Sequence, residues 1–335
     1  MSRLAKNIYG SDARFVFELL QNADDNRYTR ARARGMDPAV SFQVHQDHII
    51  VESNEDGFTE EDLTAICSVG KSTKSASYGY IGAKGIGFKS VFIAAWKVYI
   101  QSGDFSFFFK HAKGDLGLGM VQPIWMDPAE ELEGPLTRMV LYLHEAGDAQ
   151  EIEHLRKTVF KQLSDLQQTC LLFLRNIRRI SITFYSATGD VATSKEYSVS
   201  VEGSHRFAVI ADSRNGPSTE SHERQLYHVT RHTTSDLPNS DNRVVNGSKH
   251  GSTASEVVLA FPLTTELRPS VSRQELFAFL PIRESDFKVS STTLSLQISV
   301  KKSFANFRCH CSLSYKPTLT RAPIARTLSL HRNAT

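Results

Sequence analysis

Three polar side chains near the start of the chain have the types and the spacing that suit magnesium–nucleotide chemistry. Glu18, Asn22 and Asp25 fall at positions i, i+4 and i+7, so on a helix they would share one face. The amide oxygen of Asn22 is a hard ligand of the kind that Mg²⁺ prefers. Glu18, one turn earlier, could orient or deprotonate a water molecule as a general base. We therefore expect Asn22 to be the metal ligand, Glu18 the catalytic base and Asp25 a nearby polar support.

These side chains need a helix to hold them, and residues 14–25 have the pattern of one. Apolar residues recur there at spacings of three and four, which predicts a buried stripe opposite the polar face. The stripe consists of Phe15, Val16, Leu19, Leu20 and Ala23. The alternative interpretation is an ordinary amphipathic helix whose polar face is only solvated. Two further segments of the chain argue against that alternative.

The first of these segments is a pair of strand-like runs, 39–45 and 48–52, in which apolar and polar residues alternate. The second run delivers a group of polar residues to the end of a strand, where sheets present ligand contacts. Asn54 is our first choice for the contact to a nucleotide base, because its amide can both accept and donate hydrogen bonds. Asp56 and Glu55 are the alternatives, and Gly57 follows them.

The second segment contains a small, basic loop followed by a glycine-rich turn. Lys71, Ser72 and Thr73 could contact phosphate, although Gly70 to Thr73 is not a Walker A motif, because the required upstream glycine is replaced by Ala65. The glycines that follow permit positive φ and a close approach of the backbone to phosphate. A helix predicted to begin at Phe88 would offer its N–H groups to the same anion. The predicted phosphate turn comprises Gly82, Lys84, Gly85, Ile86, Gly87 and Phe88, with Lys89 adding positive charge.

In this order and spacing, segments 18–25, 52–74 and 79–91 resemble the GHKL ATPases, a superfamily that joins heat-shock chaperone ATPases, DNA gyrase, MutL and histidine kinases. The sequence looks most similar to the divergent branch that includes sacsin, the plant NO VEIN proteins and fungal relatives. In most GHKL proteins an Asp-x-Gly-x-Gly box contacts adenine. Here residues 54–58 read Asn-Glu-Asp-Gly-Phe, so the first glycine is missing and the box looks one residue shorter.

This resemblance implies ATP and Mg²⁺ as ligands and an α+β fold. The expected fold is a two-layer α/β sandwich of the Bergerat type, with a mixed, mostly antiparallel sheet, followed by a β-rich extension. We assign residues 1–185 to the ATP-binding domain and residues 186–290 to the extension, with a disordered insert near 232–255. Residues 291–335 are predicted to form a disordered tail, since the chain has eight Lys or Arg and no Asp or Glu after Asp286. A nucleic-acid-binding or membrane-binding tail and an altered reading frame both remain open.

Composition narrows the class of protein. The 335 residues are 40% hydrophobic and 22% charged, as in globular proteins, and the net charge of +3 is too small to argue for nucleic acid. No apolar run reaches the roughly 18 residues of a membrane helix, and the start has no signal-peptide core. Cys309-His310-Cys311 has poor spacing for a tetrahedral metal site. We expect a cytoplasmic or nuclear protein without a membrane or nucleic-acid partner.

Two functions follow. The first is an ATP-binding module with slow, Mg²⁺-dependent hydrolysis coupled to lid closure, chaperone-like or regulatory, with an unidentified protein client. The second is a binding or scaffold module that uses ATP only to switch shape. A histidine kinase is disfavoured because no phospho-accepting helix precedes the nucleotide segments. A MutL-like or gyrase-like ATPase is disfavoured because the sequence has no DNA-reading motif.

Overall fold

The computed structural model describes eleven stretches of the chain, which belong to one compact unit, Met1–Lys302. They are residues 15–68, 88–111, 118–128, 130–134, 136–145, 147–216, 219–234, 255–270, 275–277, 281–284 and 295–298.

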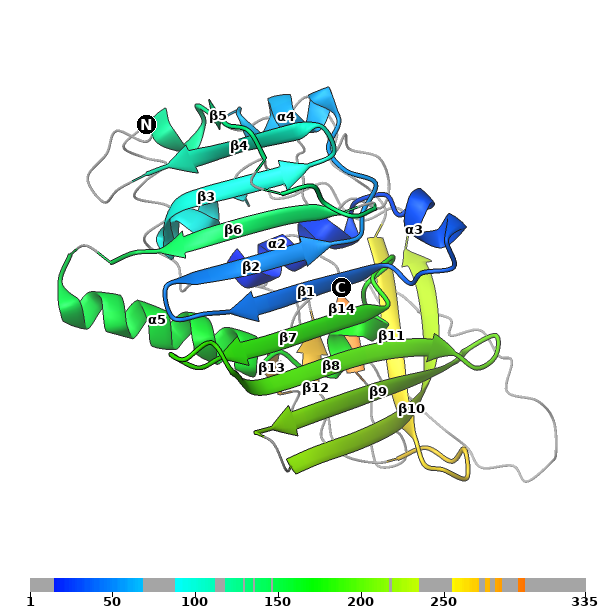
Figure 1. Cartoon of the computed structure of the whole chain (residues 1–335). Coiled ribbons are helices and arrows are strands. Elements are labelled where there is room, and N and C mark those ends of the chain that lie inside the picture. The colour runs from blue at the N-terminus through cyan, green and yellow to red at the C-terminus, as the bar shows by residue number, and fades with distance from the viewer. Residues whose placement is uncertain are drawn as a thin grey trace, which may run out of the picture. The chain divides into compact units, whose positions relative to one another are not determined.

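The strands are β1 Ala39–Val44, β2 His48–Ser53, β3 Ala95–Ser102, β4 Phe105–Lys110, β5 Ile124–Trp125, β6 Thr137–Leu143, β7 Arg179–Tyr185, β8 Val191–Val201, β9 Arg206–Asn215, β10 Thr219–Thr234, β11 Ser255–Leu263, β12 Glu275–Phe277, β13 Pro281–Glu284 and β14 Ser295–Ile298. They form one mixed sheet of fourteen strands in the order β13-β12-β14-β11-β10-β9-β8-β7-β1-β2-β6-β3-β4-β5 (Figure 1). Neighbours are antiparallel except for β1 with β7 and β12 with β14. The register of β1 and β2 pairs Val40 with Ser53 and Val44 with Ile49.

The helices are α2 Phe15–Asp24, α3 Thr29–Ala33, α4 Glu60–Ile66 and α5 Ala149–Ser164, with 3-10 segments η1 Phe88–Ile93, η2 Leu118–Met120 and η3 Gln168–Leu172. The helix predicted from the apolar stripe is confirmed as α2. Its predicted stripe is buried throughout, from Phe15 to Ala23. The start of α4 is set by a capping box, in which the Thr59 hydroxyl accepts from the Asp62 N–H and the Asp62 carboxylate accepts from the Thr59 N–H.

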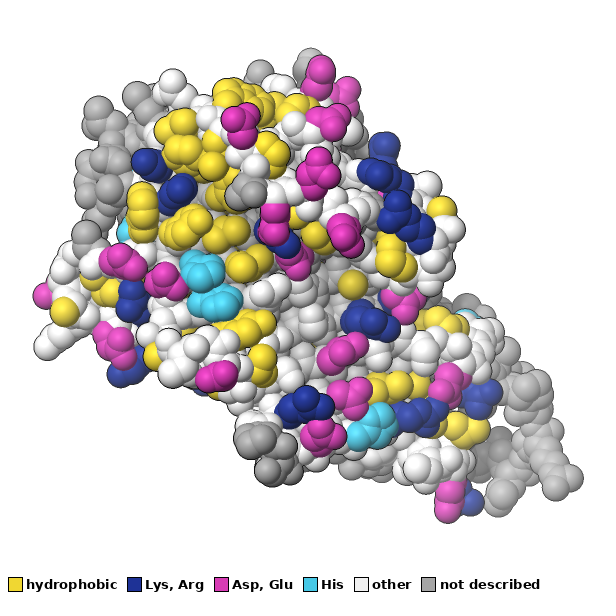
Figure 2. Space-filling view, in the orientation of Figure 1, with side chains coloured by type: hydrophobic (Ala, Val, Ile, Leu, Met, Phe, Trp, Pro, Cys, Tyr) yellow, Lys and Arg dark blue, Asp and Glu magenta, His cyan; other side chains and the backbone are white. Residues whose placement is uncertain are grey.

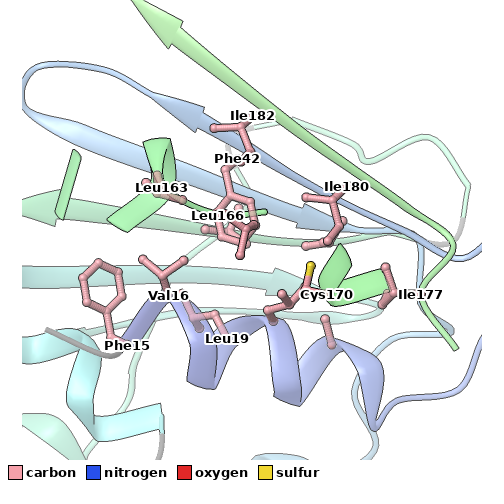
Figure 3. Close-up of a cluster of buried hydrophobic side chains, with 14 of the residues drawn as sticks. Phe15, Val16, Leu19, Phe42, Leu163, Leu166, Cys170, Ile177, Ile180 and Ile182 are labelled. Atoms are coloured by element: carbon pink, nitrogen blue, oxygen red, sulfur yellow. The ribbon is translucent and has the colours of Figure 1, made fainter. Parts of the chain in front are cut away.

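The core that positions α2 lies between this helix and the centre of the sheet. Figure 3 shows Val16 and Leu19 of α2 facing Phe42 of β1, with Ile180 and Ile182 of β7 beside it. Leu163 of α5 and Cys170 of η3 complete this cluster, and both are buried. Because these side chains come from segments far apart in the sequence, their burial holds α2 in one place against β1 and β7.

The expected fold class is wrong. In a two-layer α/β sandwich the sheet would stop at the predicted end of the ATP-binding domain, residue 185. Instead, β7 pairs directly with β8, and the same sheet continues through β9, β10 and β11. Few helices accompany this sheet in the described residues, and the fold is therefore dominated by one large mixed sheet. The physical reason is that the hairpins of residues 191–234 satisfy their backbone hydrogen bonds on the open edge of β7.

One local prediction was also wrong. The expected helix from Phe88 through Ala95 is instead the short 3-10 segment η1, which ends at Ile93, because Ala95 pairs with Leu143 at the start of β3.

The domain boundaries remain predictions. Most of the insert expected near 232–255 and nearly all of the tail expected from 291–335 lie outside the described residues. No helix that the structure describes is long and apolar enough to cross a membrane.

Candidate functional site

The polar face of α2 carries Glu18 and Asn22, two of the three residues that the sequence singled out, and Asp25 directly follows the helix. Glu18, Asn22 and Asp25 are all half-buried, whereas the opposite face of the helix is packed against the sheet. The N–H of Asp25 still donates to the carbonyl of Gln21 at 3.0 Å, so the helical spacing continues to Asp25. Glu18 and Asn22 thus lie one turn apart on α2, and Asp25 continues the helical spacing just beyond its last residue.

Asp24, next to this face, has a different environment and was not among the predicted site residues. Its side chain is fully buried, and its carboxylate accepts backbone hydrogen bonds from Arg175, Asn176 and Ile177 at 2.8–3.0 Å. Burial raises the pKa of Asp24, and these N–H donors partly offset that effect. Asp24 therefore fixes the end of α2 to the turn that leads into β7. One sequence signal was available, since Asp24 lies four residues after Leu20, in phase with the apolar stripe.

The end of α2 meets the end of β2 through paired polar side chains. The hydroxyl of Tyr28, which is fully buried, donates to the carbonyl of Ala23 at 2.8 Å and lies 2.9 Å from the hydroxyl of Ser53. The amide of Asn26 donates to the carboxylate of Glu55. Burial raises the pKa of Tyr28, and the carboxylate of Glu55 raises it further. Two motifs separated by about thirty residues in the sequence are thus in direct contact.

Asn54, the first choice for the base contact, is occupied by backbone partners. Its amide oxygen accepts from the N–H of Ala39 at 2.7 Å, and its amide nitrogen donates to the carbonyl of Asp37 at 2.8 Å. These two bonds tie the end of β2 to the segment that enters β1. In this structure Asn54 therefore holds the end of β2 to the start of β1. The contact to a nucleotide base that was assigned to it remains a prediction.

Asp56 is likewise bound to the backbone. Its two carboxylate oxygens accept from the N–H groups of Thr29 at 3.0 Å and Arg30 at 2.8 Å, at the start of α3. Burial alone would raise the pKa of Asp56, but the bonds from Arg30 and Thr29 outweigh it, so the pKa lies below the ordinary value. Glu55 differs from Asn54 and Asp56 because its carboxylate is bonded to a side chain, that of Asn26, just after the end of α2. Glu55 is also 2% exposed.

The backbone conformation at position 57 favours glycine. Its φ is +94°, and a Cβ at this position would lie 3.3 Å from the N of Gly103. The next N–H, that of Phe58, donates to the hydroxyl of Ser102 at 2.8 Å. Gly57 thus lets the chain after β2 pass close to the turn between β3 and β4.

Lys89 points into the interior, and not toward the solvent as a phosphate-binding cation would. It is 2% exposed, and its ammonium donates to the carbonyls of Ile66, at the end of α4, and Met120. The ammonium lies 4.8 Å from the ring centre of Phe109 and 5.3 Å from that of Phe88. Burial lowers the pKa of Lys89 to about 8, while the nearby thiol of Cys67 acts in the opposite direction. Phe88, predicted as a nucleotide contact, is half-buried and packs against this core.

The remaining predicted site residues lie outside the described part of the chain. They are Lys71, Ser72, Thr73, Gly82, Lys84, Gly85, Ile86 and Gly87. The Cys309-His310-Cys311 run lies outside it as well. Within the described residues, no group of three or more His, Cys, Asp or Glu side chains could hold a metal ion.

Comparison with known proteins gives two findings. Residues 3–109 match the model of the Sacsin domain. Over 187 residues the chain is 37% identical to Protein NO VEIN of Arabidopsis thaliana, a similarity that covers 53% of this chain and 7% of that relative. The matched chain thus spans a small part of the relative's length. The likeness to the sacsin and NO VEIN group that the motifs indicated is supported by both findings.

Proposed function

We propose that this chain is an ATP-binding module of the GHKL type with slow, Mg²⁺-dependent hydrolysis. The observation that carries the proposal is the direct contact between the end of α2 and the end of β2, made by Tyr28 with Ser53 and by Asn26 with Glu55. This contact brings the end of α2 beside Ser53 and Glu55, so a nucleotide lying along the helix and the end of β2 could reach both segments. The match of residues 3–109 to the Sacsin domain agrees with the family resemblance from which this proposal starts.

The donor groups on α2 fit magnesium. Mg²⁺ takes oxygen ligands and keeps several waters, so it needs few protein ligands besides the phosphates. Asn22 would hold the ion with its amide oxygen, and Asp25 would support the site one turn later. The absence of a three-ligand cluster among the described side chains is compatible with such a site. When bound, the ion would neutralise phosphate charge.

Glu18 would act as the general base. It lies one helical turn before Asn22 on the same half-buried face, so it could hold a water near phosphates gathered at Asn22. On the basis of the sequence alone, we propose that Lys71, Ser72, Thr73, Lys84 and the glycines at 82, 85 and 87 bind the phosphates. Closure of this segment over the nucleotide would couple hydrolysis to a change of shape.

For the base, we propose Glu55 as the contact in place of Asn54. The polar atoms of Asn54 and Asp56 are already engaged by backbone groups. A carboxylate accepts hydrogen bonds only, which suits the exocyclic amino group of adenine and opposes the carbonyl of guanine. Asn26 would hold the Glu55 carboxylate in place.

The alternative is a binding or scaffold module that uses ATP to switch shape without significant turnover. The specific observation in its favour is Asp56, which stands two residues after Asn54, where the Asp-x-Gly-x-Gly box has its first glycine, and whose carboxylate is bonded to the N–H groups of Thr29 and Arg30. A chaperone-like or regulatory role toward a protein client is compatible with either function, and the chain corresponds to only a small part of its long relative.

The first experiment is isothermal titration of ATP with and without Mg²⁺. We expect wild type to bind ATP more tightly with Mg²⁺, and Asn22→Ala to lose most of this metal-dependent gain while keeping its metal-free affinity. Asp165→Ala, an exposed carboxylate at the end of α5, is the matched control. Absence of ATP binding by folded wild type would refute the proposal, and equal losses with Mg²⁺ and with EDTA would make Asn22 structural.

The second experiment separates hydrolysis from switching. Glu18→Ala should retain ATP affinity and lose phosphate release by on the order of 10²–10⁴-fold, the usual contribution of a general base. Phosphate release that is equally slow in wild type and in Glu18→Ala would favour the ATP-switched binding module.

A further inference from the structure

Strand β5 carries a run of exposed apolar side chains. Ile124, Trp125 and Met126 are 46%, 57% and 40% exposed. The Trp125 ring contacts Phe107, with ring centres 5.5 Å apart, while Ile124 pairs with Phe108 and so projects from the other face of the sheet. Figure 2 shows hydrophobic side chains gathered over the end of the sheet that β4 and β5 form. Exposed apolar groups of this density, with a tryptophan among them, are typical of interaction surfaces.

Among the described residues, no strand pairs with the second side of the β5 backbone. Among the described strands β4 is its sole neighbour, and β5 ends the sheet order. The N–H of Met126 donates to the carbonyl of Ser106 on β4 at 3.2 Å. Since successive residues of a strand point their N–H and C=O to opposite sides, those of Trp125 point away from β4. An edge of this kind can accept an added strand. Pro123 and Pro128 restrict the added strand to a short one.

An acidic run follows this edge immediately. Residues 126–134 read Met-Asp-Pro-Ala-Glu-Glu-Leu-Glu-Gly, with no Lys or Arg. Glu130 pairs with the guanidinium of Arg138. The other three carboxylates are exposed and form no ion pair with any residue that the structure describes: Asp127, Glu131 and Glu133.

We propose that residues 124–128 and 130–133, here called the β5 edge, dock a short extended segment of a partner protein that is both apolar and basic. The partner segment adds to β5 as a strand. Its apolar side chains cover Trp125 on one face and Ile124 and Met126 on the other, while its Lys or Arg side chains meet the free carboxylates.

The charge of the β5 edge selects this occupant over others. A second copy of the chain would bring two acidic runs together, and like charges across a strand pair are destabilising. Nucleic acid and anionic membranes are repelled by the same carboxylates. A basic extended peptide is attracted to them, and the attraction also raises its association rate at low salt.

The test uses a synthetic probe, the blocked heptapeptide Lys-Lys-Val-Ile-Val-Lys-Lys, whose central residues place apolar side chains on both faces of an extended strand, and the intrinsic fluorescence of Trp125. In the Trp96→Phe protein, Trp125 is the remaining one of the two tryptophans. We expect saturable binding with a blue shift of Trp125 emission. Ile124→Asn and the double variant Glu131→Lys/Glu133→Lys should each weaken binding by about tenfold or more, as hot-spot and charge-pair losses do. Val201→Asn, at a residue 61% exposed on β8, should bind as wild type does.

Two further probes test the mode of binding. The same peptide with Glu in place of Lys, and the peptide with N-methyl groups on alternate residues, should both fail to bind. Circular dichroism of each variant confirms that it is folded. The proposal is overturned if the wild type does not bind the basic peptide, if Val201→Asn weakens binding as much as Ile124→Asn, or if the Glu peptide binds equally well. A concentration-dependent dimer that Ile124→Asn abolishes would also overturn it, since a second copy would then be the occupant.

Discussion

The α2–β2 junction and the β8–β10 hairpins differ in how deeply their polar side chains are buried. At the junction, Asp24 and Glu55 are almost fully buried, and each is held by specific donors. In the hairpins, ion pairs such as Arg214 with Glu220 join side chains that are 60% and 68% exposed. Removing a partner at the junction leaves buried groups without a hydrogen bond, whereas water replaces a partner in the hairpins. The comparison teaches that the geometry of the candidate site depends on a few buried polar groups.

The largest effect should come from Asp24. Asp24→Ala leaves the N–H groups of Arg175, Asn176 and Ile177 buried without an acceptor, so the free energy of unfolding should fall by about 3 kcal/mol or more. Urea denaturation measures this loss. Asp212→Ala, which removes an exposed partner of His222, is the matched variant in the hairpins and should cost less than about 1 kcal/mol. Similar losses in the two variants would contradict the comparison.

The buried ammonium of Lys89 should make the free energy of unfolding depend on pH. Its pKa in the folded protein, about 8, lies below the ordinary value of 10.5, so the unfolded chain binds more protons between these values. The cost of burying the ammonium is fully present below pH 8 and is relieved as pH rises toward 10.5. Relative to Lys89→Met, wild type should therefore gain roughly 3 kcal/mol of unfolding free energy over this window.

Denaturation of wild type and Lys89→Met at several pH values measures this difference. Lys195→Met removes a lysine that bonds the carbonyl of Ser164 from β8, and it controls for the loss of such a hydrogen bond. A difference between wild type and Lys89→Met that stays constant from pH 8 to 10.5 would show that the ammonium is not buried.

Asn54 and Glu55 are expected to have different roles in the candidate site, one in stability and the other in nucleotide binding. Asn54→Ala should lower the free energy of unfolding by roughly 1–3 kcal/mol, because the Ala39 N–H loses its acceptor and the Asp37 carbonyl loses its donor. Glu55→Gln should instead reduce the preference for ATP over GTP. Thermal unfolding and nucleotide titration of both variants separate these roles. If Asn54→Ala lowers ATP affinity at unchanged stability, the base contact expected from the sequence is the right one.

The smallest effect should come from the exposed pair in the hairpins. Arg214→Ala, Glu220→Ala and the double variant should each change the free energy of unfolding by less than about 1 kcal/mol, because water and salt screen both charges. A double-mutant cycle at low and high salt gives the coupling between them. A coupling above about 2 kcal/mol that does not depend on salt would remove the contrast between the two regions.

Much of the candidate site follows from local pattern. The apolar spacing from Phe15 to Ala23 was enough to predict α2 and therefore the shared face of Glu18 and Asn22. Alternation predicted β1 and β2, and the capping box of Thr59 and Asp62 sets the start of α4 through neighbouring residues. These features depend on residues close together in the sequence, so periodicity and capping are sufficient to indicate them.

The partners of the polar groups could not be predicted in this way. Asn54 and Asp56 have the residue types of ligand contacts, but the register of β1 with β2 and the position of α3 place backbone groups against them. Lys89 follows the glycine turn and has the type of a phosphate contact, yet it is buried beneath Phe109 and the end of α4. The role of a polar side chain depends on the donor or acceptor beside it, and that neighbour is often remote in the sequence.

By itself, the sequence determined which residues share the polar face of α2, where the strand β2 ends and where the helix α4 begins, because each depends on spacing or capping over a few residues. Only the tertiary structure decided that β7 pairs with both β1 and β8, extending one sheet where two layers were expected. It also decided that Asp24 is buried against residues more than a hundred positions away. Strand pairing and burial depend on which distant segments form the same hydrogen bonds and pack into the same core. A local sequence pattern cannot predict that choice.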